Sequence, residues 1–395
     1  MTTSTNFFID SVSLKLVNKL EEQITLDITD QMKTGAFHIV KNKNKPSKKS
    51  SSFILTPQNI YFVKKILNQT TKTISFISKA KIQIGWLYTQ FTKEIIKPYS
   101  APTYFINFRK NNKTFILSTN NKAEYSVWKN LISAWTIKTG FFDKYEVKGL
   151  IGEGSSAKVY KIIEKDTKQI FACKRIKKEA IRNDDIKKAL MNEIEILRAL
   201  KGHPNTIDLK EVFESENSIY IVTELCEGGR LIEKNKIYSF SDIIELAKAL
   251  LTVMMHIKSK QIVHRDIKPS NILLKVGKSF VNNIKLIDFG LAMFENSDIV
   301  LFPYCGTLGY LPPEALKKGS VYHPNHFSDI YSIGIILYNA LTGSRAFWDE
   351  DNKIMLRNNR EGNLDYEEQL FKQAPIKRKI ISSKFNYQFN EKRTN

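Results

Sequence analysis

His264-Arg265-Asp266-Ile267-Lys268-Pro269-Ser270-Asn271 is the stretch that decides the fold of this chain. It places a carboxylate, an ammonium group and a side-chain amide close together, directly after the apolar pair Ile262-Val263. Residues 285–290, Lys-Leu-Ile-Asp-Phe-Gly, have the pattern of a short strand that brings a second carboxylate to a glycine turn. Such groups can orient a hydroxyl, neutralise the charge of a phosphoryl group and hold magnesium.

The two segments resemble the HRDxxxxN and DFG motifs of the eukaryotic protein kinase family. Three matching residues often occur by chance, but eight in a row followed by Asp288-Phe289-Gly290 rarely do. The resemblance implies that Asp266 and Lys268 are catalytic, acting on the substrate hydroxyl and on the γ-phosphate of ATP. It also implies that Asn271 and Asp288 bind magnesium.

A glycine-containing segment upstream has the pattern of strand, turn and strand, and glycines let backbone N–H groups approach phosphate oxygens closely. By itself such a segment is more often an ordinary hairpin, but the resemblance implies a loop that covers ATP. Ala157 stands where the family has a third glycine, a change that we expect to have little effect. The residues expected to contact ATP here are Ile151, Gly152, Glu153, Gly154, Ser155, Ser156, Ala157, Lys158 and Val159.

An ion pair is expected next to this loop. Lys174 matches the lysine that grips the α- and β-phosphates from the third strand of the family's small lobe. Glu193 lies in a helix that the apolar pattern predicts from Asp185 to Leu200, and it matches the glutamate that pairs with this lysine. Taken alone, either residue would be assigned to the solvated surface.

Residues 222–229 resemble the hinge between the two lobes of a kinase. The resemblance implies that backbone groups of Glu224 and Cys226 meet the edge of adenine, with Thr223 behind them. The apolar wall around adenine would come from Ile151, Val159, Ala172 and Leu273.

Two later segments extend the likeness. Residues 304–314 resemble the substrate-docking loop, and residues 327–334 resemble the buried helix whose aspartate, here Asp329, braces the catalytic loop. Lys268 and Thr307 are the signatures of the serine/threonine type. The hinge and the Cys-Gly-Thr segment look most like the calcium/calmodulin-dependent group.

Some positions depart from the pattern of relatives that select arginine-flanked substrates. Arg230 and Ser270 stand where those relatives have acidic residues, so we do not expect that selectivity. The activation segment contains Ser297 but no threonine in the part that is usually modified, and Asp298 or Glu295 could take the place of a phosphate near Arg265. Constitutive activity and regulation by the N-terminal region are both open.

The likeness fades after residues 362–366. The family adds further helices there, with an arginine that pairs with the glutamate matched here by Glu314. A buried carboxylate without a partner is costly, so either Arg378 or Lys379 replaces that arginine or the large lobe is truncated. The alternative to an active kinase is therefore a catalytically impaired, pseudokinase-like scaffold or a membrane-docking adaptor.

The residues before Tyr145 have a different pattern. Strands are predicted at 36–40, 52–55, 60–63, 73–77, 82–87, 104–108 and 114–118, followed by a helix over 122–136 with an apolar face. Many strands followed by one helix with an inward tryptophan, Trp128, resemble a pleckstrin-homology domain. Apolar residues between Leu14 and Leu20 would allow a short helix in the first thirty residues.

The resemblance implies two alternative partners for this region. Acidic lipid headgroups could be bound by the basic segment of Lys41, Lys43, Lys45, Lys48 and Lys49, each contributing about 1 kcal/mol near a charged membrane. Ser50-Ser51-Ser52 replaces the arginine typical of lipid-binding members, which favours weak electrostatic adhesion or a docking protein over specific phosphoinositide binding.

Composition bears on three further questions: the redox state of the cysteines, association with membranes and binding of nucleic acid. Three cysteines far apart, at Cys173, Cys226 and Cys305, lack metal-ligand spacing and indicate reduced thiols. No secretory signal or membrane span is recognised, and the longest apolar stretch, 330–341, reads as a core helix. The net charge of +21 suits an anionic partner or merely solvated lysines, and no nucleic-acid-binding motif accompanies it. A cytoplasmic location is expected, with peripheral membrane association as an option.

The expected fold is therefore α+β. It comprises a two-lobed kinase, with a small β-rich lobe and a larger helical lobe that is shortened, preceded by a small pleckstrin-homology-like β-barrel with a C-terminal helix. The expected function is ATP- and magnesium-dependent phosphorylation of serine or threonine hydroxyls in protein substrates. The predicted divisions are 1–30 N-terminal segment, 31–138 pleckstrin-homology-like domain, 139–144 linker, 145–373 kinase domain and 374–395 basic tail.

Overall fold

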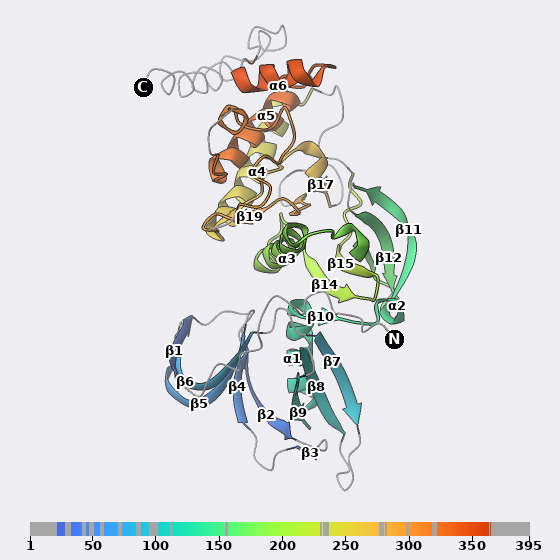
Figure 1. Cartoon of the computed structure of the whole chain (residues 1–395), viewed down its shortest axis with the longest axis vertical. Helices are drawn as coiled ribbons and strands as arrows, with labels where there is room; N and C mark the ends of the chain where they lie inside the picture. The colour runs from blue at the N-terminus through green and yellow to red at the C-terminus, as the bar shows by residue number, and fades with distance from the viewer. Residues whose placement is uncertain are drawn as a thin grey trace. The chain divides into compact units, whose positions relative to one another are not determined.

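The computed structural model describes residues 22–27, 33–41, 45–46, 51–55, 59–69, 73–83, 88–94, 102–110, 113–154, 157–229, 231, 237–275, 280, 283–297, 300–317, 322–362 and 364. The chain divides into two compact units (Figure 1). Unit 1 comprises Met1–Ile181 and Leu209–Glu224, and unit 2 comprises Arg182–Asp208 and Leu225–Asn395.

The N-terminal part of unit 1 is an antiparallel sheet followed by one helix. Its strands pair in the order β1-β6-β5-β4-β2-β9-β8-β7, and β3 pairs with the end of β2. The first half of β2 pairs with β4, whereas His38 and Ile39 pair with β9. The elements are β1 (Glu22–Asp27), β2 (Lys33–Lys41), β3 (Lys45–Pro46), β4 (Ser51–Leu55), β5 (Asn59–Gln69), β6 (Thr73–Gln83), β7 (Tyr88–Glu94), β8 (Thr103–Lys110), β9 (Lys113–Thr119) and α1 (Lys122–Trp135).

Helix α1 confirms the predicted helix. The side chain of Asn121 caps it by accepting hydrogen bonds from the backbone N–H groups of Ala123 and Glu124, at 3.0 and 3.1 Å. The buried ring of Trp128 lies edge-on to Phe53 of β4, with 6.5 Å between ring centroids. The inward tryptophan therefore anchors the helix to the core, as the sequence predicted.

Two sequence predictions for this region fall mainly outside the described residues. Of the strand expected at 82–87, residues 82 and 83 end β6, and residues 84–87 are outside the described residues. The short helix allowed between Leu14 and Leu20 is also outside them, and the strand β1 follows that segment. The pairings among the described strands do not close into a barrel, so the pleckstrin-homology-like barrel is not shown.

A short strand joins this sheet to the next one. β10 (Ile137–Lys138) runs parallel to β7 on one side and to β14 on the other. The order continues β14-β15-β13-β12-β11, and pairing with β10 covers the outer edge of β14. The elements are α2 (Phe141–Lys144), β11 (Tyr145–Glu153), β12 (Lys158–Glu164), β13 (Ile170–Lys177), the 3-10 helix η2 (Lys178–Ala180), β14 (Leu209–Glu214) and β15 (Ser218–Glu224).

The segment predicted as a linker therefore contains helix α2. Phe141 is buried and stacks on Tyr220 with 4.1 Å between ring centroids. Nearby, Nζ of Lys138 and of Lys144 both contact Oε1 of Glu211, at 2.6 and 2.7 Å. Burial lowers the pKa of Lys138 to about 8, an effect that Glu211 partly opposes.

Unit 2 is mainly helical. Helices α4 and α5 pack against each other, and two short antiparallel pairs, β16 with β19 and β17 with β18, lie beside them. Among the residues that the structure describes, no helix is both long and apolar enough to cross a membrane. The elements are α3 (Asp184–Ala199), α4 (Phe240–Ser259), β16 (Ile262–Val263), η3 (Pro269–Asn271), β17 (Ile272–Leu274), β18 (Ile284–Leu286), β19 (Met293–Phe294), η4 (Pro313–Leu316), α5 (His326–Thr342) and α6 (Asn352–Glu361).

Candidate active site

The decisive sequence stretch forms a loop between two short strands of unit 2. β16 ends at Val263, η3 spans Pro269–Asn271, and β17 begins at Ile272. Its apolar residues, including Val263 and Ile267, are buried, whereas Asp266 and Lys268 are partly exposed. The apolar positions therefore anchor the loop and leave the polar ones accessible.

Asp329 of α5 fixes the start of this loop, as the sequence suggested. Its carboxylate is fully buried and accepts hydrogen bonds from the backbone N–H groups of His264 and Arg265, at 2.7 and 2.9 Å. Arg265 has a left-handed φ of 69°, a conformation that these bonds help to maintain. Burial raises the pKa of Asp329, although His264 and the two N–H groups oppose the rise.

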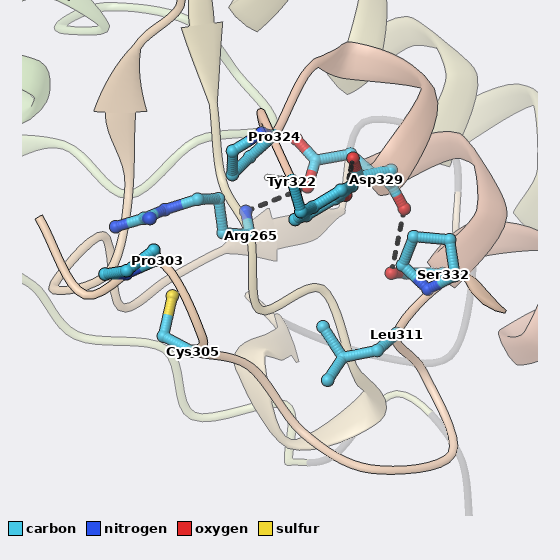
Figure 2. Close-up of a pocket in the computed structure, with 10 residues that line it drawn as sticks. Arg265, Pro303, Cys305, Leu311, Tyr322, Pro324, Asp329 and Ser332 are labelled. Atoms are coloured by element: carbon cyan, nitrogen blue, oxygen red, sulfur yellow. Dashed lines mark hydrogen bonds between the residues drawn. The ribbon is translucent and has the colours of Figure 1, made fainter. Parts of the chain in front are cut away.

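Figure 2 shows Asp329 and Arg265 at a small pocket, together with Cys305 and Leu311. None of the residues predicted to bind ATP lines this pocket. Burial raises the pKa of the Cys305 thiol despite the nearby guanidinium of Arg265. The Cys305 thiol therefore loses its proton less readily than an exposed thiol.

His264 links the loop to the segment that carries Asp288. Its Nδ1 accepts a hydrogen bond from the backbone N–H of Asp266 at 3.3 Å, so Nε2 is the nitrogen that donates to Ile287 O, at 3.0 Å. The backbone N–H of Ile287 donates to Asn271 O at 2.9 Å. Asp288, with φ of 57°, follows this point of contact directly.

Asp266 is the centre of a cluster of polar side chains. Its Oδ2 contacts Lys268 Nζ at 2.8 Å and accepts from Asn271 Nδ2 at 3.0 Å. Its Oδ1 accepts from the hydroxyl of Thr307 at 2.6 Å, and Lys268 Nζ also donates to that hydroxyl at 2.8 Å. The structure thus brings together the two predicted catalytic residues, one predicted metal ligand and the serine/threonine signature Thr307.

The oxygen atoms near this cluster suit magnesium. Asn271 uses Nδ2 for the bonds to Asp266, which leaves Oδ1 as its potential metal ligand, and Asp288 offers a carboxylate. In the described part of the chain, no group of three or more histidine, cysteine, aspartate or glutamate side chains could hold a metal by itself. One amide, one carboxylate and the phosphates of a nucleotide are a donor set of the kind magnesium uses.

The predicted ATP-covering loop lies at the turn between β11 and β12 of unit 1. Glu153 ends β11, Lys158 begins β12, and these two side chains form an exposed ion pair at 2.9 Å. Gly154 N donates to Ala157 O at 2.9 Å and closes the turn. Ser155 and Ser156 lie outside the described residues, while Ile151, Gly152 and Val159 lie on the two strands.

Strand register places three further predicted residues on one face of unit 1. Val159 of β12 is opposite Lys174 of β13, and Ala172 precedes Lys174 by two positions, so all three point to the same side of the sheet. Glu224 ends the adjacent strand β15, opposite Phe171. Two of the predicted apolar residues, Val159 and Ala172, therefore share a sheet face with Lys174.

The remaining predicted residues belong to unit 2. Glu193 is buried in α3, Cys226 follows β15 and Leu273 is the middle residue of β17. The ion pair between Lys174 and Glu193 joins residues of the two units and stays a prediction. Arg230 lies outside the described residues.

Of the two acidic residues expected to stand in for a phosphate near Arg265, only Glu295 is described. It pairs with Nδ1 of His326 at 3.1 Å, whereas Arg265 donates to Leu291 O and Phe302 O at 2.6 and 3.3 Å. The expectation for Glu314 was wrong. Glu314 is exposed, so it is not a buried carboxylate in need of an arginine. The proposed substitutes Arg378 and Lys379, like Asp298, lie outside the described residues.

The model of the protein kinase domain matches residues 145–392 of this chain. The chain belongs to the protein kinase family. The match covers both the strands that carry Lys174 and the loop that carries Asp266, and it continues past residue 373, the predicted end of the domain. The expectation of a protein kinase is thus confirmed at the level of the family, while the serine/threonine type and the roles of individual residues stay predictions.

Curated relatives include two kinases of Arabidopsis thaliana and one of Caenorhabditis briggsae. Calcium-dependent protein kinases 24 and 25 are 35% and 37% identical to this kinase over 239 and 243 residues. Calcium/calmodulin-dependent protein kinase type II is 36% identical over 231 residues. Each match covers 58% of this chain, and the chain spans 39%, 44% and 42% of the length of these relatives.

Proposed function

We propose that this protein transfers the γ-phosphate of ATP to serine or threonine hydroxyls of protein substrates. The observation that carries the proposal is the cluster of Asp266, Lys268 and Thr307, in which the three side chains contact one another within 2.8 Å. A carboxylate and an ammonium group held side by side on a buried scaffold can orient a hydroxyl and neutralise a phosphoryl group at the same place.

Each side chain then has a defined task. Asp266 accepts the hydrogen bond, and finally the proton, of the substrate hydroxyl. Lys268 stabilises the negative charge of the phosphoryl group during transfer. Thr307 holds the ammonium group of Lys268 and the carboxylate of Asp266 in position through hydrogen bonds to both. Because Asp329 holds the loop through backbone N–H groups, little reorganisation of the loop is needed during the reaction.

ATP and magnesium, which the family uses in general, are the proposed cofactors. Asn271 Oδ1 and the Asp288 carboxylate are the proposed magnesium ligands, and Lys174 is the proposed partner of the α- and β-phosphates. When bound, the metal neutralises charge on the β- and γ-phosphates. The supporting observation is the common sheet face of Val159, Ala172 and Lys174.

Replacement of the catalytic carboxylate tests the proposal. We expect Asp266→Asn to reduce phosphate incorporation into a mixed serine/threonine peptide library, with Mg-ATP, by at least about 100-fold, since an asparagine cannot accept the proton. Asp166→Asn, at an exposed turn of unit 1, is the matched control and should keep wild-type activity. Equal background incorporation by wild type and Asp266→Asn would instead favour the scaffold alternative.

We also propose that the N-terminal sheet and α1 form a pleckstrin-homology-like docking module. The supporting observations are the order of its strands, the final helix and the buried contact of Trp128 with Phe53. Acidic lipid headgroups and a docking protein are its alternative partners, in a cytoplasmic protein that associates peripherally with membranes. Co-sedimentation with vesicles that contain or lack phosphoinositides distinguishes the two partners. Binding that depends on phosphoinositides indicates lipid recognition, since only lipid recognition depends on the headgroup.

A further inference from the structure

Helix α6 is attached to unit 2 in an unusual way. Its one buried residue is polar, Asn359, whose side chain is fully inaccessible to solvent. A buried amide is costly unless its oxygen and its nitrogen both find partners. The contacts of Asn359 therefore indicate what this helix is placed to do.

Both ends of the Asn359 amide are bonded to the backbone of one loop. Oδ1 accepts from the N–H of Gly309 at 2.8 Å, and Nδ2 donates to the carbonyl oxygen of Leu311, also at 2.8 Å. Residues 308–310 form a turn, and the Asn359 amide bridges two backbone groups of this turn and the residue after it. The side chain thus fixes the position of residues 309–311 relative to α6.

The helix and the loop are also in close contact at this point. Gly309 has φ of 86°, and a Cβ atom there would come within 3.0 Å of Met355 Cε on α6. On its other side, the loop is held by Ser332 of α5, whose hydroxyl donates to Tyr310 O at 2.8 Å. The loop cannot slide along α6 without breaking these contacts.

The same loop carries Thr307 to the catalytic cluster. Tyr310 N donates to Thr307 O at 3.1 Å, which forms a turn between the clamped residues and Thr307. The Thr307 hydroxyl lies 2.6 Å from Asp266 Oδ1 and 2.8 Å from Lys268 Nζ. A shift of residues 309–311 would therefore be passed through this turn to the groups that face the substrate hydroxyl.

We propose that Asn359 is a positioning residue that clamps the loop of residues 307–311 and so sets how a protein substrate is presented to Asp266. The inference rests on the proposed kinase function and deepens it. No pattern in the sequence singled out this residue, because an asparagine in a polar helix is ordinarily solvated.

Two substitutions separate the clamp from simple packing. Asn359→Leu retains most of the side-chain volume but neither hydrogen bond. Asn359→Asp retains an acceptor and, when its carboxyl is protonated, also a donor, so it reproduces both bonds only in the protonated form. Burial raises the pKa of such a carboxyl. Asn358→Leu, at the neighbouring half-buried position of the same helix, is the matched control.

The main experiment is steady-state phosphorylation of a peptide from pH 6 to pH 8. At pH 8 we expect both Asn359 variants to raise the peptide KM about tenfold, equivalent to ~1.4 kcal/mol, while the KM for ATP stays within about twofold of wild type. Asn359→Asp should approach the wild-type peptide KM as the pH falls, and Asn359→Leu should not. Asn358→Leu should match wild type throughout.

Other results would overturn the inference. An unchanged peptide KM, with kcat reduced only in proportion to the folded fraction, would mean that Asn359 merely supports packing. A readout without catalysis is hydrogen exchange at the Gly309 amide, which should lose protection in Asn359→Leu but not in Asn358→Leu. If wild type transfers no phosphate, the proposed function fails, and unchanged Gly309 protection in Asn359→Leu would then also refute the clamp.

Discussion

At the residue scale, buried polar side chains hold the candidate site in place through main-chain groups. Asp329 accepts hydrogen bonds from two backbone N–H groups of the loop that carries Asp266, and Asn359 bonds to the backbone of the loop that carries Thr307. Backbone partners of this kind fix where a loop runs without depending on its side chains. Both loops can therefore present polar side chains outward to the site.

A stacked histidine pair of unit 2 should make stability depend on pH. His203 and His256 lie with ring centroids 3.9 Å apart. Burial, followed by His203 and Lys260, lowers the pKa of His256 from 6.5 to about 4, and burial and Lys285 lower that of His203. Below pH 6.5, His256 binds a proton in the unfolded chain but stays neutral in the folded one. The free energy of unfolding therefore decreases as the pH drops from 6.5 to 4.

We therefore expect the melting temperature of wild type to decrease across this interval and that of His256→Phe to decrease less. The variant retains an aromatic ring for the stack but has no group to protonate. His323→Asn, at an exposed position, should follow the wild-type curve and serves as the control. Parallel curves for wild type and His256→Phe, measured by thermal unfolding at several pH values, would contradict the explanation.

At the scale of elements, the segment from β10 to β11 depends on a buried charge cluster. Glu211 of β14 contacts Lys138, Lys144 and the hydroxyl of Tyr145, the last at 3.1 Å. Burial opposes ionisation of Glu211, but the two lysines outweigh it and the net effect is a lowered pKa. Such a cluster stabilises the fold only while its charges are matched.

Neutralising the shared carboxylate should therefore be costly. We expect Glu211→Gln to destabilise unit 1 by about 3 kcal/mol, because two partly buried lysines lose their common partner. Glu179→Gln, which breaks the exposed pair with Lys177 at 2.8 Å, should change stability by less than ~0.5 kcal/mol. Chemical denaturation of both variants measures the difference, and equal effects would show that burial of the cluster does not matter.

At the scale of the whole molecule, unit 1 contains one continuous run of paired strands. Because β10 pairs with both β7 and β14, the N-terminal sheet and the strands that carry Lys174 are connected by main-chain hydrogen bonds as well as by the chain.

Two truncations test the role of the connecting segment. Removal of residues 1–135 leaves β10 and α2 in place, whereas removal of residues 1–144 exposes the edge of β14 and leaves Glu211 without its lysines. We expect the longer truncation to melt at a lower temperature and to aggregate more readily, as an open strand edge allows. Indistinguishable melting and size-exclusion profiles would assign the stabilisation to residues from 145 onward.

The sequence by itself determined the family, and it predicted that Asp266, Lys268 and Asn271 lie together, because they are close neighbours that need little more than a turn to meet. It also predicted α1 and α3 from their local apolar patterns, and α5 from the family resemblance and an apolar stretch. Only the tertiary structure decided that Asn359 clamps the loop of Thr307, that Glu314 is exposed and that β10 lies between two sheets. These features depend on contacts between residues far apart in the chain, and no local pattern encodes whether a polar side chain there is solvated or buried against a backbone.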